Sequence, residues 1–481
     1  MDRSLEEAKM MEKCDGDTTD DTKEKEGHTY VQWFIAMISN TTLLAYGFHI
    51  GWVSPSSKIL QSDASPVGIP LSDSELSWMA SSSSISAAVC VIGYAYLADR
   101  FGRKPCIIAI CTVYVLTFLV QIFATSVTGL LLSRILGGVA GGGCFNVIPI
   151  YTKEISQDDI RGLLGSLTMM NMHFGVLIMY AIGSYLNYFT VLWIALGVPV
   201  VVGLLMLRAP ESPAFLVKIG EVDKATAAIS YLRGLDVNNK RVQQEIDSLK
   251  TSDAYYKSEP KSSFFSIYTN RVWRRTFIIS LAMMSVQALS GAFAILTYAS
   301  PLLDSLGVTV SPELQALSFP AIMIVGSFIS MSCVERFGRK PLLATTLLLL
   351  VISMLTIGTS FVLQQQGVIV PKWLPVLAIM VSQFSYALGA VSLPYIIMAE
   401  IFNFQIRAKA ISVLVTYSWL VTFTQLFTYN TIIQGLGAHS PFFIYAAINL
   451  FGIFVVLVLL PESKGKTVEE IEIAMGSLNR K

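Results

Sequence analysis

Polar side chains recur at helical spacing along an otherwise apolar stretch near the C-terminus. Ser418, Thr422, Gln425 and Tyr429 follow one another at i, i+4, i+7 and i+11, which places them on one face of a helix. Hydroxyl and amide groups donate and accept hydrogen bonds without carrying a charge. Such a face is suited to binding an uncharged solute that is rich in hydroxyl groups.

Two further apolar stretches carry similar polar faces. They hold Ser39, Thr42, Tyr46 and His49 in one case, and Ser382, Ser385 and Ser392 with Gly389 in the other. Residues of this kind also join helices to each other, and that is the better interpretation of any single hydroxyl. Three faces on different helices are better explained by a shared aqueous cavity. The lack of carboxylates in these stretches argues against a cationic solute.

The elements that must position these residues are long apolar runs. The 481-residue chain is 53% apolar and 14% charged, whereas soluble domains have roughly 45–50% and roughly 25%. A helix needs about 20 apolar residues to cross a bilayer, and it satisfies its own backbone hydrogen bonds there. Twelve runs qualify, at about 31–53, 75–97, 105–125, 127–151, 162–184, 188–208, 273–299, 313–334, 341–363, 373–399, 407–431 and 440–460. The sequence therefore predicts an all-α membrane protein with twelve transmembrane helices.

The distribution of basic residues predicts the orientation. All but three of the 34 Lys and Arg lie in the tails or in the loops on the same side as the tails. Since positive residues stay on the cytosolic side, both termini and the 209–272 segment are predicted to be cytosolic. Amphipathic stretches at 222–232 and 242–249 indicate that this segment is a small helical cap. The three exceptions are Lys58, Arg134 and Lys372.

Three short motifs occur twice, in the same order and about half a chain apart. One copy could follow from loop topology alone, but three ordered copies indicate an internal duplication. Two six-helix halves in the same orientation are typical of transporters with a binding site at the midplane. The repeated motifs are Asp99-Arg100-Phe101-Gly102-Arg103-Lys104 with Glu335-Arg336-Phe337-Gly338-Arg339-Lys340, the pair Glu154 and Arg161 with Glu400 and Arg407, and Pro210-Glu211-Ser212 with Pro461-Glu462-Ser463.

These patterns predict a division of the chain into five parts. The predicted parts are a cytosolic tail (1–30), a six-helix bundle (31–208), the cytosolic helical cap (209–272), a second six-helix bundle (273–460) and a C-terminal cytosolic tail (461–481).

The repeated motifs, with several others, resemble those of the sugar porter family of the major facilitator superfamily. The resemblance extends from Gly47 to Ile471. The string Gly51-Trp52-x-Ser54-Pro55, with Ser77-Trp78, is most similar to the insect facilitated trehalose transporters. The resemblance implies two pseudo-symmetric six-helix bundles and alternating access. The other motifs are Pro149-x-Tyr151-x-x-Glu154, Arg161-Gly162, Pro210-Glu211-Ser212-Pro213, Gln287-x-x-Ser290-Gly291, Ala399-Glu400-Ile401-Phe402 and Pro461-Glu462-Ser463-Lys464-Gly465-Lys466.

The resemblance also implies a cytosolic gate made of ion pairs between the two halves when the carrier is open outward. A partly desolvated network can contribute a few kcal/mol and still break reversibly, whereas an exposed pair is worth only about 0–1 kcal/mol. The gate residues are Asp99, Arg100, Arg103, Glu154, Arg161 and Glu211 in the first half, and Glu335, Arg336, Arg339, Glu400, Arg407 and Glu462 in the second.

For the substrate site, the resemblance points to Gln287, Tyr298 and Trp419. Together with the polar face of the eleventh run, the expected sugar contacts are Gln287, Tyr298, Ser418, Trp419, Thr422 and Gln425. Several positions depart from the family pattern, because amides or other polar groups are replaced. Each lost amide removes a hydrogen bond worth about 0.5–1.5 kcal/mol, so the identity of the sugar stays open. The departures are Met169, Ala288, Phe293, Val391, Ser392 and Tyr395.

His49 lies where proton-coupled relatives carry an aspartate, and Arg134 matches their partner arginine. A histidine titrates near neutral pH, so proton coupling through this pair is conceivable. A nearby arginine favours a neutral imidazole, however, and facilitated diffusion is the preferred interpretation.

The leading hypothesis is therefore a plasma-membrane uniporter for trehalose or a hexose. The alternatives are a proton-coupled sugar or polyol symporter and a transport-silent sugar sensor on the same scaffold. The net charge of +1 offers no case for nucleic acid, and no nucleophile or acid–base constellation predicts an enzyme. We expect no cofactor, no metal site and no obligate protein partner, only the sugar and the lipid bilayer.

Overall fold

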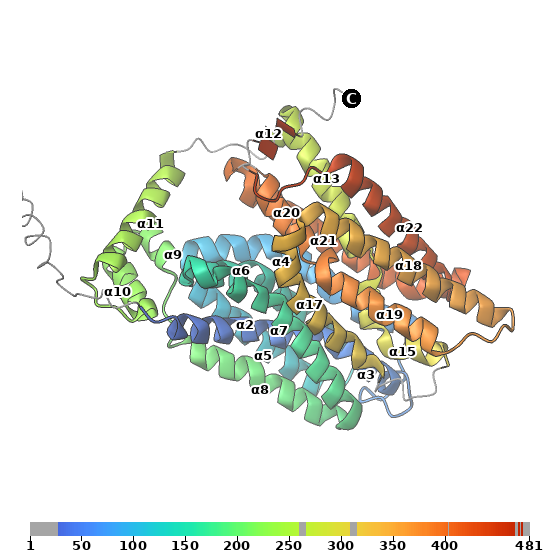
Figure 1. Ribbon diagram of the computed structural model, residues 1–481. Helices are drawn as coiled ribbons and strands as arrows, with labels where there is room; N and C mark the ends of the chain where they lie inside the picture. The colour runs from blue at the N-terminus through green and yellow to red at the C-terminus, as the bar shows by residue number, and fades with distance from the viewer. Residues whose placement is uncertain are drawn as a thin grey trace, which may run out of the picture.

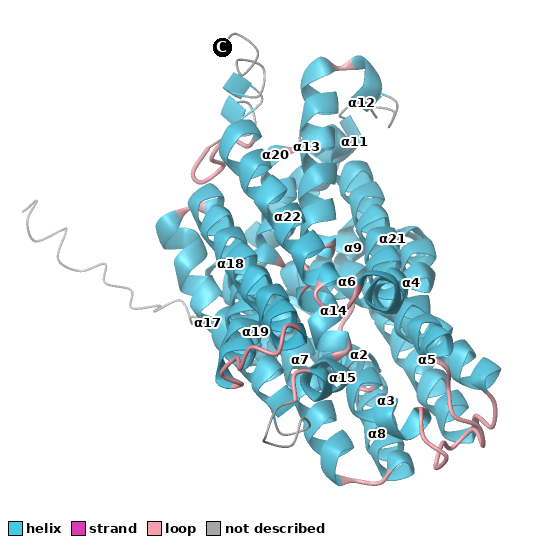
Figure 2. Ribbon diagram, turned by 90° about the vertical axis from the view of Figure 1, so that its right-hand side faces the viewer, coloured by secondary structure: helices cyan, strands magenta, loops and turns pink. Residues whose placement is uncertain are grey.

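Every regular element among the described residues is a helix (Figures 1 and 2). The prediction of an all-α fold is confirmed. Of the predicted tails, most of 1–30 and much of 461–481 lie outside the described residues. The computed structural model describes residues 27–258, 266–307, 315–402, 404–466, 470–471 and 473–474.

The first half consists of six spanning elements, the first of which is broken in two. In Figure 1 this half runs from blue to green. We call the end of the helices at which α4 meets α5 the basic end, and the other end the opposite end. The elements are α2 (Tyr30–Gly51) followed by α3 (Val53–Leu60), α4 (Asp73–Phe101), α5 (Arg103–Phe123), α6 (Val127–Ile155), α7 (Asp158–Tyr185) and α8 (Tyr188–Met206).

The second half repeats this arrangement, with more breaks in its helices. Its seventh and tenth spanning elements are each built from three consecutive pieces. The elements are α13 (Arg271–Ala288), α14 (Ala292–Thr297) and α15 (Ala299–Ser305), then α17 (Ser318–Phe337), α18 (Arg339–Gln365), α19 (Trp373–Ser385) with the π-helical turn η1 (Tyr386–Ala390) and α20 (Leu393–Ile401), α21 (Phe404–Leu436), and α22 (Ser440–Phe454) with the π-helical turn η2 (Val455–Leu459).

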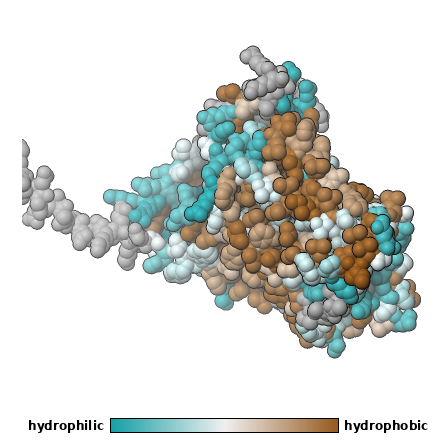
Figure 3. Space-filling model, turned by 45° about the vertical axis from the view of Figure 1, so that its right-hand side comes forward, coloured by the Kyte–Doolittle hydropathy of each residue, from teal (hydrophilic) through white to brown (hydrophobic). Residues whose placement is uncertain are grey.

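Ten of these elements are long and apolar enough to cross a membrane. The other two predicted runs are also helical. They correspond to α2, which carries the polar side chains of Gln32, Asn40 and His49, and to α17, whose apolar part is the shorter Ser318–Val334. In Figure 3 hydrophobic residues cover the middle of the molecule and hydrophilic residues gather toward its two ends. This surface is the one expected of a chain that crosses a bilayer.

The segment between the halves is helical, as its amphipathic pattern predicts. It contains α9 (Pro213–Lys218), α10 (Val222–Arg233), α11 (Lys240–Ser258) and α12 (Ser266–Thr269). The first three surround a small apolar core of their own that includes Leu216, Ile229, Val242 and Ile246. We call α9, α10 and α11 the cap.

The cap is fastened to the first half by a buried arginine. Arg233 is 3% exposed and donates to both carboxylate oxygens of Glu245 on α11, at 2.6 and 3.1 Å. It also donates to the carbonyl of Ile155 at the end of α6, at 2.8 Å. Gln32 of α2 donates to the Leu232 carbonyl from the other side. The cap therefore rests on the basic end of the first half.

The two halves meet along two helix pairs. α4 of the first half packs on α21, and α7 packs on α17. The broken elements lie beside these contacts, since α3 contacts α15 and α14 contacts both α2 and α21. Irregular backbone is tolerated inside a membrane where protein or a cavity surrounds it, so these breaks mark the region in which a binding site is expected.

Inside the first half, α2 and α7 approach each other through a pair of glycines. A Cβ atom added to Gly47 would lie 2.3 Å from the Met172 carbonyl oxygen, and one added to Gly175 would lie 2.3 Å from the Leu44 carbonyl oxygen. Backbone lies against backbone at this point, so no side chain can move aside to make room. The spacing of the two helices depends on the absence of side chains at both positions.

We predict that Gly175→Ala destabilises the protein by about 1–3 kcal/mol, because the methyl group forces α2 and α7 apart. Thermal unfolding of the purified protein measures this loss. Gly165→Ala on the same helix is the matched control, since no atom lies within 4 Å of its added Cβ. The control should be neutral or stabilising by up to about 1 kcal/mol, because alanine is the better helix former. Equal unfolding temperatures for the two variants would contradict the close approach.

Candidate functional site

A central cavity of about 620 Å³ lies between the two halves. Elements of both halves line it, among them α2, α6 and α7 on one side and α13, α17 and α21 on the other. The lining residues are Tyr46, Phe145, Met169, Met172, Gln287, Ala288, Phe293, Leu296, Met323, Tyr386, Val391, Tyr395, Ser418, Trp419 and Thr422.

The polar wall of the cavity is a connected network centred on Gln287. The amide nitrogen of Gln287 donates to the Tyr386 hydroxyl, and its amide oxygen accepts from Ser418, both at 3.1 Å. Thr422 donates to the Ser418 carbonyl at 2.9 Å. These bonds fix the orientation of the amide before any solute enters. A polyhydroxylated solute could bind by adding to the network or by replacing one of its bonds.

The remaining walls are apolar and aromatic. Three methionines, Met169, Met172 and Met323, and the ring of Phe293 line the cavity. Trp419 of α21 crosses to the first half, where its ring centroid lies 6.3 Å from that of Tyr46 and 5.8 Å from that of Phe145. Mostly apolar walls with a few placed polar groups are the usual construction of a ligand pocket.

Only some of the residues that were expected to contact the sugar line the cavity. Gln287, Ser418, Trp419 and Thr422 line the cavity, and so do the departures Met169, Ala288, Phe293, Val391 and Tyr395. Tyr298, Gln425 and Ser392 are not among the lining residues. Tyr298 instead stacks on Tyr429, with ring centroids 4.8 Å apart, and donates to the Leu426 carbonyl at 3.0 Å. The amide of Gln425 is buried without a hydrogen-bond partner among the described residues.

The sequence did not point to Tyr386, Met172 or Met323 as lining residues. Tyr386 begins the π-helical turn η1, where one extra residue shifts the phase of the tenth element. A search for polar residues at regular helical spacing cannot detect this shift. The two methionines carry no polar signal at all.

Hydrogen bonds between the halves close the cavity toward the opposite end. Ser54 of α3 bonds to both the hydroxyl and the backbone N–H of Ser300, at 3.2 and 3.1 Å. Other such bonds are Asn430 to Ser77 and Gln434 to Asp73, each at 2.9 Å, and Tyr180 to the Leu296 carbonyl. Each bond is worth about 0.5–1.5 kcal/mol, so the closure is firm but reversible.

The pair His49 and Arg134 is buried inside the first half. Arg134 is 1% exposed and donates to the carbonyls of Met79, at 2.9 Å, and of His49. It also lies 3.2 Å from Nδ1 of the His49 ring. With a guanidinium N–H directed at it, Nδ1 acts as the acceptor and the ring is neutral. Carbonyl oxygens thus take the place of a carboxylate as partners of this arginine.

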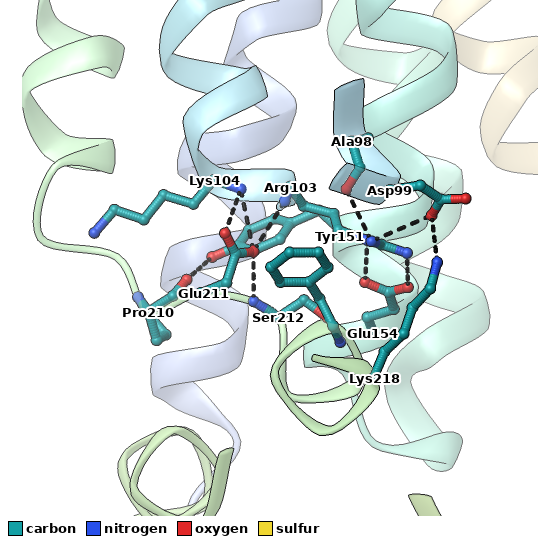
Figure 4. Close-up of polar contacts among 11 residues, drawn as sticks. Ala98, Asp99, Arg103, Lys104, Tyr151, Glu154, Pro210, Glu211, Ser212 and Lys218 are labelled. Atoms are coloured by element: carbon teal, nitrogen blue, oxygen red, sulfur yellow. Dashed lines mark hydrogen bonds and ion pairs between the residues drawn. The ribbon is translucent and has the colours of Figure 1, made fainter. Parts of the chain in front are cut away.

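At the basic end of the first half, Arg103 lies on Glu154 (Figure 4). Its Nε and Nη2 atoms are 2.8 and 2.9 Å from the two carboxylate oxygens, and Asp99 lies 3.5 Å away. The side chains of Arg103 and Glu154 are only 9% and 17% exposed. Arg103 also donates to the Ala98 carbonyl and sits 5.3 Å from the centroid of the Phe215 ring of the cap. The arginine therefore joins α4, α5, α6 and α9.

The second half repeats this pair, although both contacting nitrogens of Arg339 approach the same oxygen of Glu400. Arg339 lies 3.0 and 3.1 Å from Glu400, and it donates to the carbonyl of Val334. Ser463 donates to the other oxygen of Glu400 at 2.6 Å. The motifs that are duplicated in the sequence therefore form equivalent arginine–glutamate pairs in the two halves.

A second acid in each half caps the helix that begins at the arginine. Glu211 accepts from the backbone N–H of Arg103 at 3.0 Å, and Glu462 from that of Arg339 at 3.1 Å. The glycine before each arginine has a φ of +103° or +87°, which glycine alone adopts readily. A Cβ atom at Gly102 would lie 2.2 Å from the Glu211 carboxylate. The repeated motif therefore needs glycine at this position both for its backbone angle and for the space that the acid occupies.

The pKa values of the two equivalent acids are shifted in opposite directions. Burial raises the pKa of Glu211 above its usual value, although three backbone N–H groups and Arg103 oppose this. For Glu462 burial also acts to raise the pKa, but the N–H groups of Lys464, Arg339, Lys340 and Ser463 prevail and leave it below its usual value. Acidification therefore neutralises the acid of the first half before that of the second.

The other predicted gate residues make more exposed contacts. Arg100 donates to the Tyr96 hydroxyl, Arg161 pairs with Asp158, and Arg407 donates to the Phe402 carbonyl. The carbonyl of Arg336 accepts from Lys464. The side chain of Glu335 lies outside the described residues. The pairs of Arg103 and Arg339 each stay within one half, so ion pairing between the halves stays a prediction for a state that is closed at the basic end.

Comparison with known proteins assigns the chain to a family. The family model described as "Sugar (and other) transporter" matches residues 27–475. The chain belongs to this transporter family. The resemblance inferred from its motifs is confirmed, as is the prediction of a transporter rather than an enzyme.

Curated relatives and solved structures agree with this assignment. The chain is 28% identical over 93% of its length to the facilitated trehalose transporter Tret1 of Anopheles gambiae, and spans 56% of that protein. It is 26% identical to Tret1 of Bombyx mori, over 94% of the chain and 88% of the relative. The xylose transporter XylE from E. coli in an inward-open conformation matches with a TM-score of 0.76 at 20% identity, covering 92% of this chain and 99% of XylE. The XylE likeness confirms the major facilitator fold.

We predict that Glu154→Gln destabilises the protein by about 1–3 kcal/mol, because it leaves the buried guanidinium of Arg103 without its main counter-charge. Thermal unfolding at neutral pH measures the loss. Asp158→Asn is the matched control, since Asp158 is the 88% exposed partner of Arg161 and an exposed pair contributes about 0–1 kcal/mol. If Glu154→Gln lost no more stability than Asp158→Asn, the buried ion pair would contribute no more to stability than the exposed one.

Proposed function

We propose that the protein is a facilitative sugar transporter that works by alternating access. The observation that carries this proposal is the central cavity, which both halves line and which hydrogen bonds between the halves close toward the opposite end. A binding site shared by two bundles can face one side at a time when the bundles rock against each other. The preformed Gln287 network supplies uncharged donors and acceptors that suit hydroxyl groups.

The proposed substrate is trehalose or a hexose. Relatives named as facilitated trehalose transporters support the disaccharide. No charged side chain is among the described residues that line the cavity, so a neutral solute is favoured over an ionic one. The wall formed by Met169, Phe293 and Met323 is apolar, so it makes contact with carbon atoms and forms few hydrogen bonds with hydroxyl groups. This favours a polyol or a less polar solute as a second candidate.

We further propose that the basic end faces the cytosol of the cell and that the protein resides in the plasma membrane. The support is the concentration of Lys and Arg in the loops and the cap at that end.

The test is uptake of labelled trehalose, glucose, fructose and inositol into proteoliposomes. We expect saturable trehalose or hexose uptake, and we expect Gln287→Ala to raise the KM about fivefold to tenfold through the loss of hydrogen bonds in the cavity. Thr424→Ala is the control, because Thr424 is an exposed residue of α21 whose hydroxyl, among the described residues, bonds only to the preceding turn. Absence of saturable uptake for the whole panel would refute the proposal.

Uptake by this carrier should not be accelerated by an inward proton gradient. Arg134 already directs an N–H at His49 Nδ1 and places its positive charge beside the ring, which disfavours a second charge there. Uptake at fixed sugar with and without a pH difference across the membrane measures this, with His49→Asn as the variant that cannot titrate. Gradient-driven accumulation that His49→Asn abolishes would establish a symporter instead.

A further inference from the structure

A second cavity, of about 410 Å³, lies entirely within the first half. It is formed where the end of α2 and the start of α3 meet the end of α7 and the start of α8, at the opposite end of the helices. It shares no lining residue with the central cavity, so solute transport does not account for it. The lining residues are Trp52, Pro55, Ser56, Ile59, Met179, Gly183, Leu186, Tyr188 and Val191.

Two aromatic residues that line this cavity each carry a buried polar atom without a hydrogen-bond partner among the described residues. Trp52 is 1% exposed, and its indole Nε1 contacts no acceptor among the described residues. The buried hydroxyl of Tyr188 likewise has no hydrogen-bond partner in the described part of the chain. The two rings lie edge to face with centroids 6.0 Å apart. Because an indole N–H can only donate, the cavity is built to receive a hydrogen-bond acceptor.

The surroundings limit the chemistry of that acceptor. None of the lining residues in the described part of the chain is charged, so an anion would gain no counter-charge from them. The neighbouring surface is apolar, with Leu186 and Phe189 43% and 49% exposed. α8 runs along the outer edge of the first half (Figure 1) and is only 33% buried over its apolar window. A neutral acceptor is therefore favoured, and the exposed apolar surface of α8 beside the cavity is where a lipid would lie.

Tryptophan and tyrosine side chains gather at the level of lipid headgroups, where the neutral acceptors that a bilayer supplies include the ester carbonyls of its glycerolipids. We propose that this cavity binds the ester-linked glycerol region of a membrane lipid, whose carbonyl oxygen accepts from Trp52 Nε1 and from the Tyr188 hydroxyl. The acyl chain of that lipid extends along the exposed apolar surface of α8.

The site is placed to influence the closure at the opposite end. Trp52 directly precedes α3, and two residues later Ser54 makes the bonds to Ser300 of the second half. Pro55 of α3 packs closely on α7, since a Cβ atom at Gly183 would lie 2.8 Å from its ring. A lipid bound between α3 and α8 holds α3 in the position from which Ser54 reaches Ser300. A ligand that favours one conformation shifts the equilibrium toward it.

The experiment compares ester-linked with ether-linked phosphatidylcholine of the same chains, because only the ester lipid has carbonyl oxygens. Each lipid is titrated onto the full-length purified protein and bound lipid is counted by native mass spectrometry. We expect the tightest-bound ester lipid to bind at least about fivefold more tightly than its ether analogue. Trp52→Phe and Tyr188→Phe should each reduce this preference. Equal binding of the two lipids by the unmodified protein would overturn the proposal, and it is the result expected if water alone occupies the cavity.

Trp193→Phe on the lipid-facing surface of α8 is the matched control, since Trp193 is 51% exposed and does not line the cavity. It should keep the full ester preference. Tyr188→Phe removes a single oxygen, so it still tests the site if Trp52→Phe fails to fold. The unfolding temperature of each variant in detergent checks its fold. An ester preference that persists in both Trp52→Phe and Tyr188→Phe would place the lipid elsewhere and overturn the assignment.

Discussion

A buried arginine paired with a glutamate of a neighbouring helix holds together the basic end of each half. Arg103 with Glu154 and Arg339 with Glu400 join elements that are far apart in the sequence. The acid that follows the sixth spanning element of each half caps the helix that begins at the arginine. A bundle fastened in this way can move as one body, and alternating access requires bodies of that kind.

The cavity lies where the helices are least regular, and this placement has a physical reason. A continuous helix uses its backbone polar groups internally and offers a solute only side chains. The seventh element breaks between α13 and α14, directly after Gln287 and Ala288, and the tenth contains the π-helical turn that begins at Tyr386. At these breaks, side chains point toward the cavity that a straight helix would direct elsewhere. The cavity is thus shaped by interruptions of the secondary structure.

The sequence predicts the number of spanning elements, their order and the duplicated ion-pair motifs, because apolar runs and repeated strings are local properties. It also predicts that Ser418 and Thr422 share a face and that Met169 and Phe293 stand at the site. It does not predict that Gln425, on the same face, lies beyond the cavity, since the extent of the cavity along α21 depends on the other half. Tyr386 escapes detection because a π-helical turn leaves no mark in a helical periodicity.

The two ends of the molecule are held by different kinds of contact. Closure at the opposite end rests largely on serine, asparagine and glutamine side chains, such as Ser54 with Ser300 and Asn430 with Ser77. The basic end is organised by ion pairs that are largely buried, and salt screens such pairs much less than exposed ones. Changes in ionic strength on either side of the membrane therefore have little effect on these contacts, because one set is mostly uncharged and the other is shielded from mobile ions.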